Sequence, residues 1–117
     1  MKEDKINPKH YNDYDYQPLY FLRDIMSDEE FNWFLIGQVV KYISRHRKKD
    51  GKQDLQKALF YLNLVKEVPY IDPTTLSKFA GQLVGRDKMN IHFLFLDIAA
   101  CKNTLEDTIK HYADYFN

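Results

Sequence analysis

Cysteine is almost absent from this 117-residue chain, in which Cys101 is the only one. A single cysteine excludes an internal disulfide and is typical of proteins from a reducing compartment. Cys101 lies in an apolar run, so we expect it to be buried and inert; a reactive thiol is the alternative. Long apolar stretches are absent as well, because Asp97 interrupts the longest one. We therefore expect no membrane span, and no targeting segment at the charged N-terminus.

The phosphate-binding loops of common nucleotide enzymes are also missing. The chain contains no G-x-x-x-x-G-K-[ST] and no G-x-G-x-x-G after a predicted strand, and Gly51-Lys52 lacks the upstream glycine and the Ser/Thr of the first motif. His46 and His92 have no ligand partner at metal spacing, so we predict no metal site in the protein. An enzyme built on the usual phosphate loop is therefore excluded.

Charge is balanced overall but unevenly distributed. Residues 1–30 carry four Lys or Arg and eight Asp or Glu, residues 31–66 carry eight and two, and residues 67–117 carry five and seven, which gives net charges of −4, +6 and −2. A basic segment within a neutral chain favours an anionic ligand. DNA-binding domains are usually basic as a whole, so we expect no DNA binding.

Apolar residues at helical spacing, together with helix-capping residues, predict an all-α fold. We expect one domain over residues 1–117, a compact bundle of about five helices around an antiparallel helical hairpin. Ser27 and Glu30 form a capping box, Asp28 and Glu29 are acids of the helix start, and Asp50-Gly51 ends this helix. The expected parts are an extended Tyr-rich arm (1–26, with a helical turn at 19–26), a basic hairpin (27–67) and C-terminal helices (72–117). The expected helices span 27–49, 54–67, 72–84, 89–101 and 103–116.

A helical wheel places polar residues of the hairpin beside its apolar face. The core face of the first helix consists of Phe31, Phe34, Leu35, Val39, Tyr42 and Ile43. The band along the edge of that face consists of Gly37, Lys41, Arg45 and Lys48. The corresponding band of the second helix consists of Asp54, Lys57 and Tyr61. When the hairpin closes, both bands border one shared groove.

This groove has the chemistry of a phosphate site. Arg45 can bind an oxyanion through two nitrogens, while Lys41 and Lys57 supply point charges. Asp54 would orient Lys41 or Arg45, or hold a metal ion.

The tyrosines and the glycine of the groove have two interpretations. Tyr42, Tyr61 or a tyrosine of the arm would stack on a base, and Gly37 would let a ligand approach the backbone. Alternatively, the basic band is a solvated face with cations at a helix C-terminus, the two tyrosines border the core, and Gly37 is a helix–helix contact.

The same positions carry a resemblance to a known family. His10-Tyr11 precedes Gly37-x3-Lys41-Tyr42-x2-Arg45-x3-Lys49-x-Gly51-x2-Asp54-Leu55-x-Lys57-Ala58-x2-Tyr61-Leu62. Over residues 7–66 this pattern is similar to a small phage-encoded family, long described as a domain of unknown function, in which a coliphage member is a nucleotide kinase acting on deoxynucleoside monophosphates. The resemblance implies a single site formed by His10, Lys41, Arg45, Asp54, Lys57 and Tyr61. His10 is alternatively a packed or solvated residue of the arm. Gln38 stands where the family usually has Asn, and residues 68–117 have no counterpart.

We therefore expect a phage nucleotide-binding protein in the cytoplasm of an infected bacterium, a nucleoside monophosphate kinase that transfers phosphoryl groups between nucleotides. The alternatives are a non-enzymatic phage protein that inhibits a host factor such as a defence nuclease, and a nucleic-acid-binding module. Mg²⁺ would arrive with the nucleotide, and the apolar segment 89–101 with Phe60 and Leu64 predicts a homo-oligomer. The expected catalytic residues are Lys41, Arg45, Asp54 and Lys57. The expected nucleotide- or phosphate-binding residues are His10, Tyr11, Gly37, Tyr42, Lys48, Lys49 and Tyr61.

Overall fold

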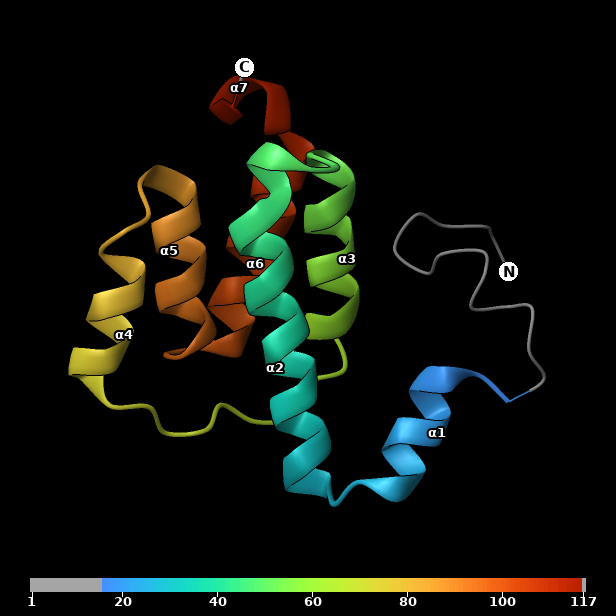
Figure 1. The fold of residues 1–117 in the computed structure, drawn as a ribbon. Helices are drawn as coiled ribbons and strands as arrows, with labels where there is room; N and C mark the ends of the chain where they lie inside the picture. Colours follow the sequence, from blue (N-terminus) through green and yellow to red (C-terminus); the bar gives the residue numbers. More distant parts are fainter. Residues whose placement is uncertain (1–15, 117) are drawn as a thin grey trace.

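Helices account for all regular secondary structure in residues 16–116, the part of the chain that the computed structural model describes (Figure 1). The elements are α1 (Pro18–Ile25), α2 (Asp28–Arg45), the 3₁₀ helix η2 (His46–Lys48), α3 (Lys52–Leu62), α4 (Pro73–Ala80), α5 (Gly85–Leu94), α6 (Ile98–Lys110) and α7 (Tyr112–Phe116). The predicted all-α class is confirmed. Of the arm expected at residues 1–26, residues 1–15 lie outside the described residues, and α1 occupies most of the remainder.

The start of α2 follows from local chemistry. The Ser27 side chain accepts a hydrogen bond from the Glu30 backbone N–H (3.1 Å), and the Glu30 carboxylate accepts one from the Ser27 backbone N–H (2.8 Å). Both bonds satisfy N–H groups that have no partner within the helix. The predicted capping box is confirmed.

The hairpin of α2 and α3 is the centre of the fold. The two helices run antiparallel side by side, and α7 lies beside the turn that joins them (Figure 1). Gly51, at this turn, has a φ of +57°, which residues with a Cβ rarely adopt. The α-helical part of the first long helix ends at Arg45 rather than near Lys49, because residues 46–48 tighten into η2.

The C-terminal half contains more and shorter helices than we expected. Gly85 was predicted to end a helix, yet it begins α5 with a φ of +55°, and the preceding helix already ends at Ala80. The expected helix at 89–101 is interrupted after Leu94, where Asp97 caps α6 by accepting bonds from two backbone N–H groups. The predicted helix start at residue 103 therefore lies inside α6.

The core lies between α2, α3, α5 and α6, with α4 against α5. Cys101 contributes to it and is fully buried, as predicted. Burial raises the pKa of its thiol to about 12. The largest fully buried apolar side chains are Leu35, Val39, Ile43, Leu55, Leu62, Ile91, Leu94 and Leu105. Phe31 and Phe34, also expected in the core, pack against it while partly exposed.

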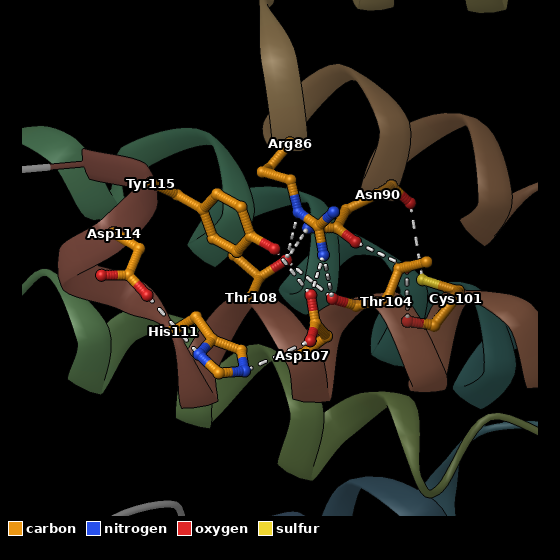
Figure 2. A network of polar contacts seen from close by, with 9 residues as sticks. All are labelled: Arg86, Asn90, Cys101, Thr104, Asp107, Thr108, His111, Asp114 and Tyr115. Atoms are coloured by element: carbon orange, nitrogen blue, oxygen red, sulfur yellow. Dashed lines mark hydrogen bonds and ion pairs between the residues drawn. The ribbon is translucent and has the colours of Figure 1, made fainter.

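A polar network joins α5, α6 and α7 (Figure 2). Arg86 of α5 forms a salt bridge with Asp107, donates to the Thr108 hydroxyl (3.2 Å), and lies over the Tyr115 ring, 4.2 Å from its centroid. The Tyr115 hydroxyl donates to Asp107 (2.8 Å). Buried Asn90 extends the network by donating to the same Thr108 hydroxyl (3.3 Å). The network aligns the C-terminal helices and thereby positions α7 at the hairpin turn.

Helix α1, which like α7 has no buried residue, lies at the edge of the bundle and contacts α2, with Leu19 packed against the core (Figure 1). Phe21 and Ile25 are 49% and 61% exposed. None of the helices in residues 16–116 is long and apolar enough to span a membrane.

Candidate functional site

Three basic side chains of the hairpin gather around one aromatic ring. Lys41 and Arg45 project from α2, and Lys57 projects from α3. The Lys41 Nζ, Arg45 Cζ and Lys57 Nζ atoms lie 5.0, 4.9 and 5.5 Å from the centroid of the Tyr42 ring. Cations at this distance are attracted to the electron-rich face of an aromatic ring. Side chains from both helices thus meet at one ring, as the helical wheel predicted for these three residues. We call Lys41, Arg45 and Lys57 the cation cluster.

Tyr42 itself is held from the opposite helix. Its ring stacks with the Tyr61 ring at 6.1 Å with an interplanar angle of 5°, and the Phe34 ring meets Tyr61 edge-on at 6.5 Å. Tyr42 and Tyr61 are only 8% and 5% exposed. They therefore serve as a rigid base for the cations, and little of either ring is available to stack on a nucleobase.

Arg45 is oriented by a buried carboxylate. Its Nε and Nη2 atoms each donate to one oxygen of Asp54, both at 3.2 Å. Asp54 is 0% exposed and also accepts from the backbone N–H of Asp50 (3.1 Å). The hydrogen bonds to Asp54 raise the pKa of Arg45 above its ordinary value. The sequence left open whether Asp54 orients Lys41, orients Arg45 or holds a metal ion. The structure shows that Asp54 orients Arg45.

The cluster retains excess positive charge. Asp50 lies 3.7 Å from Arg45 Nη2 and 3.9 Å from Lys57 Nζ, and it is half exposed. Within the described part of the chain, no carboxylate lies within salt-bridge distance of Lys41. Among residues 16–116, three cations therefore face two carboxylates, which gives this group a net charge of +1, and Lys41 is the cation without a carboxylate partner there.

The other predicted site residues lie around this cluster or beyond the described chain. Gly37 is exposed one turn before Lys41, and a Cβ added to it would meet no atom within 4 Å, so no neighbouring helix requires a glycine there. Lys48 and Lys49 are exposed at the hairpin turn. His10 and Tyr11 lie outside the described residues.

His46 is the centre of a second cluster that the sequence did not reveal. Its ring is 1% exposed, with Nε2 2.8 Å from an Asp87 oxygen and Nδ1 2.8 Å from the Tyr112 hydroxyl. Arg47 donates to the other Asp87 oxygen (2.7 Å), and the Phe116 ring lies 4.6 Å from the imidazole. The partners are 41 and 66 residues away in sequence, so no local pattern indicated them. This cluster joins α5 and α7 to η2, which directly follows Arg45 at the end of α2.

The donor set of the site does not fit a metal ion held by the protein. No group of three or more His, Cys, Asp or Glu side chains suited to a metal occurs in residues 16–116. Both oxygens of Asp54 are occupied by donors, and Asp50 faces two cations. The site thus consists of basic groups held in place by a buried carboxylate and a buried ring, an arrangement whose chemistry suits an anion.

Comparison with known proteins matches residues 5–63 to a family described as "Protein of unknown function (DUF3310)". No curated protein and no solved structure matches the chain. The expected membership of a nucleotide kinase family is therefore wrong, because the matching family has no assigned function and nothing in the match indicates a kinase. The matched segment covers half of the chain and contains α1, the whole hairpin of α2 and α3, and the cation cluster. The chain belongs to the DUF3310 family of proteins of unknown function.

Proposed function

We propose that this protein binds a nucleotide through its phosphate group at the cation cluster. The observation that carries the proposal is the convergence of Lys41, Arg45 and Lys57 on the Tyr42 ring, within 5.5 Å of its centroid. Like charges repel at short range, so an anion bound between them would relieve the repulsion. A phosphate group fits because it accepts several charge-assisted hydrogen bonds at once.

The three cations would have different tasks. Arg45 is already paired with Asp54, so it presents a fixed guanidinium edge to the ligand. Lys41 is exposed and has no carboxylate partner in the described chain, so it would bind the phosphate most directly. Lys57 is 19% exposed and would neutralise charge from the α3 side. Oxyanions are bound well by such a combination of a planar guanidinium and two point charges.

We further propose phosphoryl transfer between nucleotides as the reaction. An oxygen of the bound monophosphate would form a bond to the γ-phosphorus of a nucleoside triphosphate, and the bond from that phosphorus to the β-γ bridging oxygen would break. The electron pair stays on the β-phosphate, so two nucleoside diphosphates result. Positioning and charge neutralisation supply most of the catalysis in such reactions. We place Mg²⁺ with the triphosphate, as the acidic residues of the site already have protein partners.

A binding experiment tests the site. Thermal stability would be measured with deoxynucleosides and with their mono- and triphosphates, with and without Mg²⁺. A ligand at a hundredfold excess over Kd stabilises the native state by about 2.7 kcal/mol, a shift of several degrees. We expect the phosphorylated ligands alone to shift the parent protein. Lys41→Ala should reduce the affinity about tenfold, and Lys88→Ala, which removes an exposed lysine of α5, should not.

The outcomes separate binding from catalysis. No shift with any nucleotide, or equal loss in Lys41→Ala and Lys88→Ala, would reject the site. For the reaction, a deoxynucleoside monophosphate is incubated with ATP labelled at the γ-phosphate, and the labelled diphosphate is measured. Binding without label transfer in the parent protein would retain the binding site and reject the kinase reaction.

A homo-oligomer remains part of this proposal. Leu64, at the end of the hairpin, is 40% exposed and Leu96, after α5, is 69% exposed. Phe60 of α3 is partly buried against the core. Exposed apolar side chains on several elements favour self-association. Light scattering coupled to size-exclusion chromatography measures the mass directly, and a mass of 14.0 kDa at all concentrations would exclude an oligomer.

A further inference from the structure

A groove lies at the N-terminal end of α2, away from the cation cluster. Its larger hollow measures about 570 Å³ and lies between the first turns of α2 and residues 66–70 of the α3–α4 connector (residues 63–72). A second hollow of about 240 Å³ shares Asp28, Asn32 and Lys66 with the first, so the two adjoin. Cavities of this size accommodate side chains or small ligands. We call the pair the acidic groove.

The floor of the groove is already formed. Asn32 is 8% exposed, and its side-chain Nδ2 donates to the Glu67 backbone carbonyl (2.8 Å). Its Oδ1 accepts from the Lys66 backbone N–H (3.0 Å). These two bonds hold the connector against α2, so a ligand entering the groove would not first have to order its walls.

The lining of the larger hollow is acidic and aromatic. Two aromatic side chains, Trp33 (42% exposed) and Tyr70 (83% exposed), line it together with the carboxylates of Asp28, Glu29 and Glu67 and one cation, Lys66, which leaves a net charge of −2. Among the described residues, none of these carboxylates forms a salt bridge and neither ring contacts another ring or a cation. A guanidinium or ammonium group is attracted both by aromatic faces and by carboxylates.

The smaller hollow has an apolar side formed by Phe31, Leu35 and Leu64, of which Leu64 is 40% exposed. The rest of its lining is polar or charged and consists of Arg23, Asp28, Asn32 and Lys66. A ligand that fills both hollows therefore needs a basic group beside an apolar one, which a peptide provides at positions i and i+2 of an extended strand. The basic turn of a second copy, residues 45–52, does not meet this requirement, since it contains no apolar side chain.

We propose that the acidic groove binds an extended basic–apolar peptide segment of a partner protein. An Arg or Lys side chain enters between Trp33 and Tyr70, and an apolar side chain fills the smaller hollow. This surface is independent of the proposed nucleotide site, because Glu29 and Arg45 are sixteen residues apart on α2, about 24 Å along its axis. Trp and Tyr at its centre are the residue types that contribute most to binding at protein interfaces.

The single tryptophan of the chain provides the assay. Trp33 emission is titrated with the peptide acetyl-Arg-Ser-Leu-amide, and with acetyl-Glu-Ser-Leu-amide as the control ligand. We expect a saturable change with the basic peptide alone, with a Kd on the order of 1 mM. Added salt should weaken it, because it screens the exposed carboxylates.

Matched variants decide the location. Glu67→Lys reverses a charge of the groove without changing the backbone carbonyl that Asn32 binds, and Glu106→Lys makes the same change at an exposed position of α6. We expect Glu67→Lys to weaken peptide binding at least about fivefold, Tyr70→Ala to weaken it about threefold, and Glu106→Lys to leave it unchanged. Nucleotide-induced stabilisation, where present, should be the same in all four proteins.

Several results would overturn the proposal. They are the absence of a saturable change, an equal response to the acidic peptide, and equal weakening by Glu67→Lys and Glu106→Lys. A parent protein that self-associates and is dissociated by Glu67→Lys but not by Glu106→Lys, measured by light scattering, would instead assign the groove to a second copy of the chain.

Discussion

Removal of the Tyr112 hydroxyl tests how the C-terminal helices support the hairpin turn. Tyr112→Phe keeps the ring of α7 and deletes one hydrogen bond, that to His46 Nδ1 (2.8 Å). Asp87 contacts the other ring nitrogen, so the Tyr112 hydroxyl is the partner of Nδ1 among the described residues. Because His46 is 1% exposed, water cannot replace the lost partner.

The expected cost follows from this burial. Leaving a buried polar atom without a partner costs about 2 kcal/mol of the free energy of unfolding. For a domain of this size the melting temperature should fall by about 8 °C. Tyr115→Phe is the matched control, because it deletes a hydroxyl of the same helix that also donates at 2.8 Å, in this case to half-exposed Asp107. Water can satisfy that carboxylate, so we expect no resolved change.

Thermal and urea unfolding of the parent and both variants provide the measurement. The urea midpoint should fall in Tyr112→Phe at an unchanged slope, because the surface exposed on unfolding is the same. If the two variants have the same stability, the burial of His46 does not decide the cost, and the reasoning is refuted. If Tyr112→Phe is destabilised as expected, nucleotide affinity in that variant then shows whether the turn also orients Arg45.

Three further predictions concern single side chains. Cys101 should react with a thiol reagent only as fast as the protein unfolds. Its pKa is raised to about 12, so the buried thiol stabilises the protein below the thiol pKa of the unfolded chain, and this stabilisation is lost as pH rises towards 12, by about 1.4 kcal/mol per pH unit. The urea midpoints measured at pH 8 and pH 10 should therefore differ less in Cys101→Ala than in the parent protein. Ser27→Ala removes one bond of the capping box and should cost about 1 kcal/mol in urea unfolding, and an unchanged midpoint would contradict this. Asn32→Ala deletes both bonds that hold the connector and should cost about 2 kcal/mol while shifting Trp33 emission to longer wavelength; a native-like spectrum would show that the groove does not depend on Asn32.

The sequence predicted the cation cluster well because its residues belong to adjacent helices joined by a short turn. Lys41 and Arg45 are four residues apart on α2, and Asp54 and Lys57 are three apart on α3, so helical periodicity places each pair on one face. A short link requires the two faces to meet. The buried stack of Tyr42 on Tyr61 was less predictable, because the same tyrosines fit a solvent-facing role equally well.

Two of the three helix starts with a side-chain cap, those at Ser27 and Asp72, were predicted correctly, whereas the start capped by Asp97 and several helix ends were not. Ser27 and Asp72 each accept a hydrogen bond from a backbone N–H three residues on, an interaction contained in the local sequence. Gly85 was misassigned because a glycine at positive φ occurs at either boundary of a helix. The break after Leu94 depends on Asp97, which the apolar run around it concealed.

What the sequence by itself determined is therefore the all-helical class, the hairpin and its basic face, since these depend on contacts a few residues apart. Only the tertiary structure decided the environments of His46 and Asn32. Asp87 and Tyr112 reach His46 across 41 and 66 residues, and the connector reaches Asn32 across 34 and 35. Periodicity and capping describe neighbours along one helix, whereas these contacts exist only once distant helices have packed.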